Sequence, residues 1–271
     1  MRVVTANVNG IRAAARRGGL EWLARADADV VALQEVRADE DQLHKALADA
    51  GLGHWHLAQA CSSTRGHAGV AVLSRLPLLE VRPLPPSPFG LQGRWVEADV
   101  ETSTGAVTVA STYVHTGEAG TTRQDEKYAF LATVEDRLAA WTRAGRSAVL
   151  AGDLNIAHTA EDLKNWKGNL GRAGFLEEER ATLDRWLGLH VVDVHRHLHG
   201  PGPGPYSWWS WRGRAFDNDA GWRIDYQLAT PPLAERATEA WVGRAPSYAQ
   251  RWSDHAPLVV DYELDIPGWS S

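Results

Sequence analysis

The sequence predicts an α/β fold, a four-layer sandwich of two packed mixed β-sheets flanked by helices. Short β-branched runs alternate with segments of helical length rich in Ala, Leu, Arg and Glu. Hairpin-like strand pairs occur beside these crossovers, which predicts sheets that mix parallel and antiparallel strands. The chain has 271 residues, of which 44% are apolar, so it can bury a substantial core.

Each element follows from its local pattern. Two strands are expected within 94–115, joined by a turn at Ser103 to Gly105. The other expected strands cover residues 2–8, 29–36, 69–75, 147–157, 191–194, 223–230 and 257–264. A helix is expected after each of the first two strands. Two further helices are expected over residues 122–142 and 177–187.

One catalytic domain spanning residues 1–271 is expected, because no change of composition and no flexible linker divides the chain. The Pro/Gly-rich stretches Pro83 to Gly90 and Gly200 to Pro205 are interpreted as surface loops. The single cysteine, Cys61, allows no internal disulfide, and no apolar run approaches the roughly 18 residues of a membrane span. We therefore expect a soluble cytoplasmic monomer without membrane contact.

The charge balance limits the function classes. There are 28 basic and 34 acidic residues, a net charge of -6, which argues against binding nucleic acid mainly by bulk electrostatics. A metal-dependent nuclease remains compatible, because clustered carboxylates offset a basic rim in the total. The chain lacks GxxxxGK[ST], CxxC and HExxH motifs, which disfavours nucleoside triphosphate use and structural or protease-type zinc.

Polar side chains recur where the predicted strands stop. A single such residue is usually solvated or caps a helix, but strand ends on one edge of a sheet converge and form ligand clefts. The set comprises Asn7, Glu35, Tyr113, Asp153, Asn155, Asp225, Asp254 and His255.

Side-chain alternation assigns partners within this set. Asp153 and Asn155 are two residues apart and can face one ligand, whereas the neighbours Asp254 and His255 should point apart. If His255 is catalytic, another carboxylate must hold its second ring nitrogen, and Asp225 is the candidate. Carboxylate and amide oxygens suit a hard cation such as Mg²⁺ or Mn²⁺, which favours metal-assisted phosphodiester hydrolysis.

An ordered set of motifs resembles the exonuclease III family of the endonuclease/exonuclease/phosphatase superfamily. That family contains Mg²⁺-dependent enzymes that act on abasic sites in DNA. The resemblance covers residues 1–264 and rests on NVNGIRA (Asn7 to Ala13), LQEVR (Leu33 to Arg37), STYVHTG (Ser111 to Gly117), GDLNIA (Gly152 to Ala157), WRIDY (Trp222 to Tyr226) and SDHAP (Ser253 to Pro257).

The resemblance implies that Glu35 binds the metal directly, with Asn7 and Asp254 nearby as ligands or as partners of ligands. Asn9 stands where some eukaryotic relatives carry an acid, so a second metal position would be less negative in this chain.

The resemblance also implies the catalytic roles. Asp153 would position and deprotonate the attacking water, and Asn155 would hold that water or a phosphate oxygen. His255, oriented by Asp225, would stabilise charge on the phosphate in the transition state. Tyr113 would donate its hydroxyl to the phosphate or the leaving oxygen.

Aromatic residues near Asp225 divide between core and pocket. The family resemblance implies that Trp208 and Trp222 line a slot for a flipped-out abasic sugar. It also implies that Phe216, in the following loop, inserts into the duplex as a wedge. Other tryptophans of this segment, such as Trp209, are interpreted at least equally well as core residues.

Basic and histidine residues carry weaker signals, because a lone surface arginine is usually only solvated. His195, His197 and His199 would share one strand face at a spacing that suits a transition metal, but no acid or cysteine completes the set, so we interpret them as surface residues. The candidates for contacts with the DNA backbone are Arg12, Arg37, Arg94, Arg123 and Lys127.

The leading hypothesis is a DNA-repair exodeoxyribonuclease III or abasic-site endonuclease, acting on double-stranded DNA with abasic sites or blocked 3′ ends. It would have 3′-phosphodiesterase activity and could add a 3′-to-5′ exonuclease activity. One alternative keeps the cleft but changes the substrate to RNA, an inositol phosphate or a phospholipid head group. The other is an inactive DNA-binding protein, which would have no use for carboxylates that repel a polyanion without a metal.

Overall fold

A computed structural model describes residues 1–83 and 88–266 and contains two six-stranded mixed sheets. The first sheet has the order β11 (Ala237–Val242), β12 (Leu258–Tyr262), β1 (Arg2–Asn7), β2 (Val30–Gln34), β4 (Val70–Ser74) and β3 (His56–Ala60). The second has the order β5 (Leu78–Pro83), β6 (Trp95–Thr102), β7 (Gly105–Tyr113), β8 (Ala148–Asp153), β10 (Asp225–Ala229) and β9 (Val192–Asp193). The pairs β1–β2 and β7–β8 are parallel, and the other neighbours are antiparallel.

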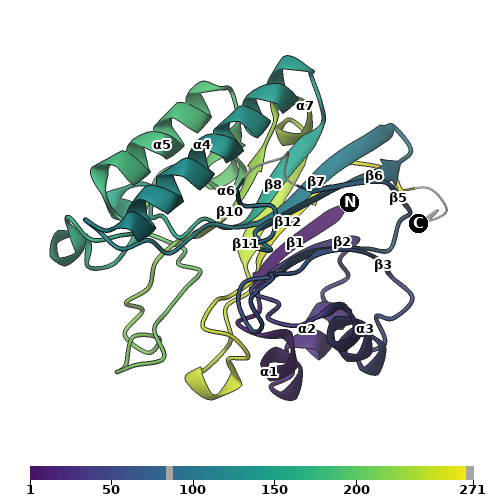
Figure 1. Cartoon of the computed structure of the whole chain (residues 1–271), viewed down its shortest axis with the longest axis horizontal. Helices are drawn as coiled ribbons and strands as arrows, with labels where there is room; N and C mark the ends of the chain where they lie inside the picture. The colour runs from purple at the N-terminus through teal and green to yellow at the C-terminus, as the bar shows by residue number, and fades with distance from the viewer. Residues whose placement is uncertain (84–87, 267–271) are drawn as a thin grey trace.

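Helices cover the two outer faces of this sheet pair (Figure 1). The first sheet is covered by α1 (Ile11–Arg16), α2 (Gly19–Arg25) and α3 (Glu40–Asp49). The second is covered by α4 (Thr122–Arg143) and α5 (Glu177–Gly188), and the short helices are α6 (Val194–His199) and α7 (Pro231–Ala234). Three 3₁₀ turns cover Ala160–Asp162, Trp166–Asn169 and Tyr248–Gln250. This order of layers confirms the predicted fold class.

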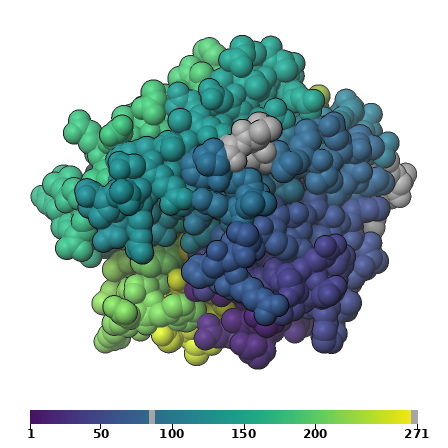
Figure 2. All heavy atoms as spheres, in the orientation of Figure 1, coloured from purple at the N-terminus to yellow at the C-terminus, as the bar shows by residue number. Residues whose placement is uncertain are grey.

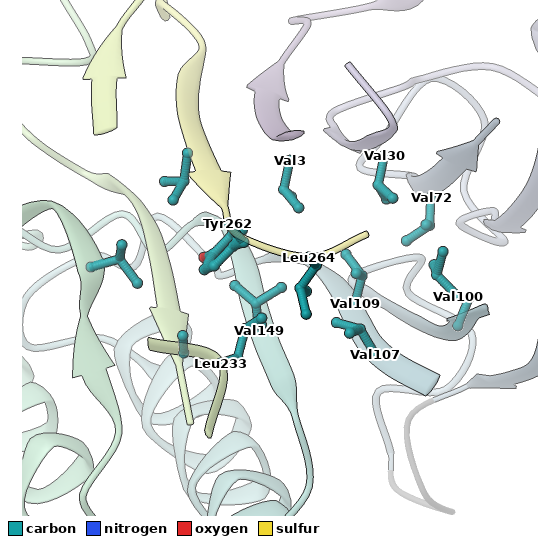
Figure 3. Packing of buried hydrophobic residues seen from close by; sticks show 14 of the residues in the cluster. Val3, Val30, Val72, Val100, Val107, Val109, Val149, Leu233, Tyr262 and Leu264 are labelled. Atoms are coloured by element: carbon teal, nitrogen blue, oxygen red, sulfur yellow. The ribbon is translucent and has the colours of Figure 1, made fainter. Parts of the chain in front are cut away.

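Strand alternation produces the three apolar layers between these elements. On β1, Val3 faces the second sheet while Val4 packs toward the helices of the first sheet. On β8, Val149 faces the first sheet and Leu150 packs toward α4 and α5. Figure 3 shows valines of the two sheets meeting in the central layer. Full burial of each such side chain stabilises the fold by about 1.5–3 kcal/mol.

The space-filling view shows the halves built on the two sheets closing against each other (Figure 2). The helices α1, α2 and α3 of the first sheet lie in the purple and dark blue region, and α4 and α5 of the second sheet lie in the teal and green region. No helix in the described ranges has both the length and the apolar character needed to cross a membrane.

Sequence patterns did not predict β3, β5 and β11, and all three are edge strands. An edge strand faces solvent on one side and does not need a continuous apolar run. Most residues of β5 are exposed, and Pro83 ends the strand at a position that lacks a backbone donor. Pro83, the first residue of the expected loop, belongs to β5 instead, and residues 84–87 lie outside the described part. Residues 200–205 form no helix or strand, as expected.

The expected strand face with His195, His197 and His199 is wrong, because these residues lie on the helix α6. The Asp193 side chain accepts a hydrogen bond from Arg196 N at 3.3 Å and caps this helix, so the strand ends at Asp193. His195 and His199 are then one turn apart with ring centroids 4.6 Å from each other, and His197 is exposed. The three imidazoles do not form one ligand set.

Candidate active site

The sheet ends gather the predicted polar residues around one cavity of about 370 Å³. The register places Asp153 opposite Asp225 on the antiparallel neighbour and beside Tyr113 on the parallel one. Of the predicted residues, the cavity is lined by Glu35, Arg37, Tyr113, Asp153, Asn155, Trp208, Trp222, Asp254 and His255. Four lining residues have no counterpart among the predictions: Thr116, Ala173, Gly174 and Ile224.

Tight backbone turns place two of these side chains. Glu35 directly follows β2, and Asn155 lies two residues after the end of β8. Both have φ of 50°, a left-handed conformation that is uncommon for residues other than glycine. Such strain persists where the surrounding contacts hold it and is concentrated at functional sites. The Asn155 backbone N–H donates to Asp153 Oδ1 at 2.8 Å, and its side chain donates to Val114 O at 2.9 Å.

Asn7 joins the two central carboxylates. Its Nδ2 donates to Glu35 Oε1 at 2.9 Å and to Asp153 Oδ2 at 2.9 Å, and the side chain is fully buried. A neutral amide in this place satisfies one oxygen of each acid and keeps the two carboxylates beside each other.

His255 is held by the acid that the alternation argument expected. Its Nδ1 lies 2.8 Å from Asp225 Oδ2, and Ser207 Oγ donates to the same oxygen at 2.6 Å. The other ring nitrogen, Nε2, lies 3.7 Å from Asp153 Oδ2. Sequence reasoning missed Ser207, which follows no periodic pattern and reaches Asp225 only through the folding of its loop.

Burial and neighbouring charges shift the pKa values of His255 and Asp153. Burial lowers the pKa of His255, but the Asp225 and Asp153 carboxylates outweigh it and raise the pKa to about 10. Burial also raises the pKa of Asp153, to about 7, although the neighbouring His255 opposes this shift. The arrangement therefore offers a cationic imidazolium beside a carboxylate suited to accept a proton near neutral pH.

Within the described residues, Glu35, Asp153 and His255 form a group whose ligand atoms lie within 4.8 Å of one another. The two buried carboxylates suit a divalent cation, whereas His255 as an imidazolium has no free lone pair for the ion and can only lie beside it. Asp254 stands apart from this group, because its Oδ1 accepts from Asn9 Nδ2 at 2.7 Å and its Oδ2 from Trp208 Nε1 at 3.1 Å. This geometry favours the alternative in which Asp254 acts through its neighbours.

Two tryptophans form an apolar wall of the cavity. The rings of Trp208 and Trp222 meet edge to face with centroids 6.4 Å apart. Gly174 approaches them with φ of 88°, and a Cβ atom there would lie 3.1 Å from Trp222 and 3.3 Å from Asn155 O. The Gly174 position thus helps to set the width of the cavity.

Phe216 does not fit the expected role of a wedge. Only 4% of it is exposed, and its ring packs edge to face on Trp209 with centroids 5.3 Å apart. A side chain that stacks into a duplex must project from the surface, whereas Phe216 fills a small core under its own loop. Trp209 belongs to the same core, as the core interpretation predicted.

The basic candidates occupy different environments. Arg37 lines the cavity, pairs with Glu35 and continues into a neighbouring groove together with Arg12. Arg94 lies behind Tyr113, with its guanidinium 4.9 Å from the ring centre, and burial lowers its pKa. The groove also contains Arg65, which sequence reasoning missed.

Two further basic candidates lie away from the cavity. Arg123 is largely exposed and pairs with Glu118 at 3.3 Å. Lys127 cannot contact DNA as expected, because it is fully buried against Glu179.

The chain is similar to known proteins along almost its whole length. A sequence profile of the Endonuclease/Exonuclease/phosphatase family matches residues 4–255. An exodeoxyribonuclease of Bacillus subtilis (strain 168) is 32% identical over 265 residues, which cover 96% of this chain and 98% of that protein. Exodeoxyribonuclease III of Haemophilus influenzae is 30% identical over 275 residues, covering 97% and 100%. The structure of an AP endonuclease from Archaeoglobus fulgidus matches with a TM-score of 0.86 and 26% identity, covering 97% of this chain and 99% of that one.

Proposed function

Because this chain belongs to the endonuclease/exonuclease/phosphatase family, we propose that it is a DNA-repair nuclease that hydrolyses the phosphodiester bond 5′ to an abasic site. On double-stranded DNA it also removes blocking groups from 3′ ends and degrades the strand from 3′ to 5′. It acts as a single catalytic domain and as a monomer in the cytoplasm. The observation that carries the proposal is the convergence of Glu35, Asp153 and His255 beside the Trp208–Trp222 wall.

The acidic group suits Mg²⁺, or Mn²⁺ in its place, and Glu35 would be the direct ligand. Asn7 would support the site by holding Glu35 and Asp153 together, and Asp254 would support it through Asn9 and Trp208. When bound, the ion supplies Lewis-acid stabilisation of the negative charge on the phosphate oxygens.

The protein's own groups carry the proton transfers. Asp153 accepts a proton from the attacking water, and its raised pKa makes it an effective base near neutral pH. The His255 imidazolium, oriented by Asp225, stabilises the charge that develops on the phosphate. Asn155 holds the water or a phosphate oxygen, and the Tyr113 hydroxyl donates to the phosphate or to the leaving oxygen.

The Trp208–Trp222 wall supports selectivity for a baseless sugar. A deoxyribose without its base can enter a narrow apolar slot that excludes an intact nucleotide. The close approach of Gly174 to Trp222 keeps this slot narrow.

The direct test is cleavage of a labelled duplex with one abasic analogue, in Mg²⁺ and in EDTA. We expect a metal-dependent cut on the 5′ side of the lesion that Asp153→Asn abolishes and that the exposed control Asp136→Asn retains. An intact abasic duplex, together with hydrolysis of RNA, an inositol phosphate or a phospholipid head group, would assign the cleft to another substrate. Binding of DNA without cleavage and without sensitivity to EDTA would indicate an inactive DNA-binding protein.

A further inference from the structure

A fully buried lysine lies beside the active site without taking part in the mechanism above. Lys127 is on α4, and none of its side chain is exposed. Removing an ammonium group from water costs several kcal/mol unless partners replace the lost hydration. The position of Lys127 therefore needs an explanation in its contacts.

One partner is an acid at the start of the next long helix. Lys127 Nζ donates to Glu179 Oε1 at 2.6 Å, and neither side chain is exposed. Glu179 Oε1 also accepts from Gln124 Nε2 at 2.9 Å, and its Oε2 accepts from Leu176 N at 2.9 Å. Gln124 and the Leu176 backbone therefore hold Glu179 to α4 and to the N-terminus of α5, independently of its contact with Lys127.

The other partners are backbone carbonyls of two active-site loops. Lys127 Nζ donates to Asn155 O at 2.9 Å and to Thr116 O at 3.2 Å. Both Asn155 and Thr116 line the cavity. An ammonium has three protons, and these three contacts account for all of them, so none remains for a DNA phosphate.

The loops are closely packed on the lysine stem. Gly117 follows Thr116 with φ of 76°, and a Cβ atom there would lie 2.4 Å from Gln124 Oε1 and 3.0 Å from Lys127 Cδ. Asn155 has a left-handed conformation, with φ of 50°, and its carbonyl accepts the hydrogen bond from the Lys127 ammonium. The hydrogen bond from Lys127 to the Asn155 carbonyl therefore helps to hold the strained turn in which Asn155 lines the cavity.

We propose that Lys127 is a positioning residue for catalysis: charge-paired to Glu179, it fixes the loops that carry Asn155 and Thr116 at the wall of the cavity. This role rests on the proposed nuclease function. It predicts an effect on turnover more than on substrate binding, since the loops place groups toward the reacting phosphate while the Trp208–Trp222 wall is untouched.

The test compares Lys127→Met with Gln124→Met in steady-state cleavage of the abasic duplex. Both changes bury a methionine on the same helix, remove a bond to Glu179 and keep a side chain packed beside Gly117, but only Lys127 donates hydrogen bonds to the loop carbonyls. We expect Lys127→Met to lower kcat by about 10- to 100-fold with KM changed less than about threefold. Gln124→Met should keep kcat within about twofold of the parent. Lys127→Arg, which keeps the charge and several donors, should retain more turnover than the methionine variant.

Hydrogen–deuterium exchange provides a readout that does not depend on activity. Lys127→Met, or Lys127→Gln if the methionine variant does not fold, should exchange faster in peptides 113–118 and 153–158 than the parent does. Strands β1 and β12 should be unchanged. Unchanged exchange in both peptides would overturn the positioning role, as would folded Lys127→Met with parental kcat or an equal loss in Gln124→Met. If the parent itself does not cut abasic DNA, the proposed function fails and the exchange data still decide the role of Lys127.

Discussion

Trp208 Nε1 lies 3.1 Å from Asp254 Oδ2, so one wall of the cavity is tethered to the carboxylate that precedes His255 in the chain. Asp254 Oδ1 is occupied by Asn9 Nδ2 at 2.7 Å. Burial raises the pKa of Asp254, but the adjacent His255 and the Trp208 and Asn9 donors outweigh it and lower the pKa below its usual value. Asp254 therefore stays ionised and connects the shape of the slot with the charged centre.

Loss of this tether should weaken selectivity. Trp208→Phe keeps an aromatic wall but removes a hydrogen bond to a charged acceptor, worth about 1.5–3 kcal/mol. We expect the ratio of abasic-site cleavage to exonuclease activity to fall about tenfold. The measurement is kcat/KM of the parent and of Trp208→Phe on both substrates, and the core residue Trp209 is not mutated. An unaltered ratio would mean that the indole N–H has no part in selectivity.

The orientation of His255 should depend on Asp225. Asp225→Asn replaces the charged acceptor of His255 Nδ1 with an amide, which removes the main carboxylate that keeps the imidazole protonated. We expect kcat to fall by about 10²-fold or more, with duplex binding little changed. Single-turnover cleavage and a fluorescence anisotropy titration would separate the two effects. A comparable loss in binding would instead assign Asp225 to substrate contact.

Mn²⁺ affinity should distinguish the role of Glu35 from that of Asp254. Glu35→Gln removes the proposed direct ligand, so Mn²⁺ affinity measured by electron paramagnetic resonance should fall by about 100-fold. Asp254→Asn should weaken it by about tenfold or less, since both oxygens of Asp254 are engaged by Asn9 and Trp208. Equal losses in the two variants would make Asp254 a ligand and would contradict the grouping seen here.

A buried acid outside the cavity should control acid stability. Asp162 Oδ1 accepts from Arg223 Nε at 2.7 Å and from Arg196 Nη2 at 2.6 Å. Burial raises the pKa of Asp162, but the two arginines and the Thr159 backbone N–H outweigh it and lower the pKa to about 2. The stabilisation is present above the unfolded value of about 3.9 and is lost as pH falls through about 2.

Asp162→Asn should cost about 1.5–3 kcal/mol of unfolding free energy at pH 7, because buried Arg223 loses the charged acceptor of its Nε and keeps its pairing with Asp193 at 2.8 Å. Urea unfolding of both proteins at pH 7, 4 and 3 should show the gap between them narrowing as the pH falls. A gap that stays constant over this range would rule out the predicted linkage.

Several features of the site follow from local chemistry and were predictable. The pairing of Asp225 with His255 followed from strand alternation, because neighbours on an extended chain point to opposite faces. The central strands were predictable from their apolar runs, whereas β3, β5 and β11 were not, because an edge strand can leave one side to solvent.

The errors concern residues whose environment is set by distant segments. Lys127 has the side chain of a surface residue, and only the approach of Glu179, 52 positions along the chain, makes its burial tolerable. Phe216 was assigned to a DNA contact and instead fills a core with Trp209. His195 was placed on a strand, but the Asp193 cap starts a helix at that point.

By itself, the sequence determined the layered fold, the order of the central strands along the chain and the polar residues at their ends, because periodicity and residue type act locally. Apart from the Asp225–His255 pair, the tertiary structure decided which of these residues meet. It placed Asn7 between Glu35 and Asp153, tied Trp208 to Asp254 and buried Lys127 under the loop of Asn155. The physical reason is that strand register and loop closure, which no local pattern encodes, set the distances between segments far apart in the chain.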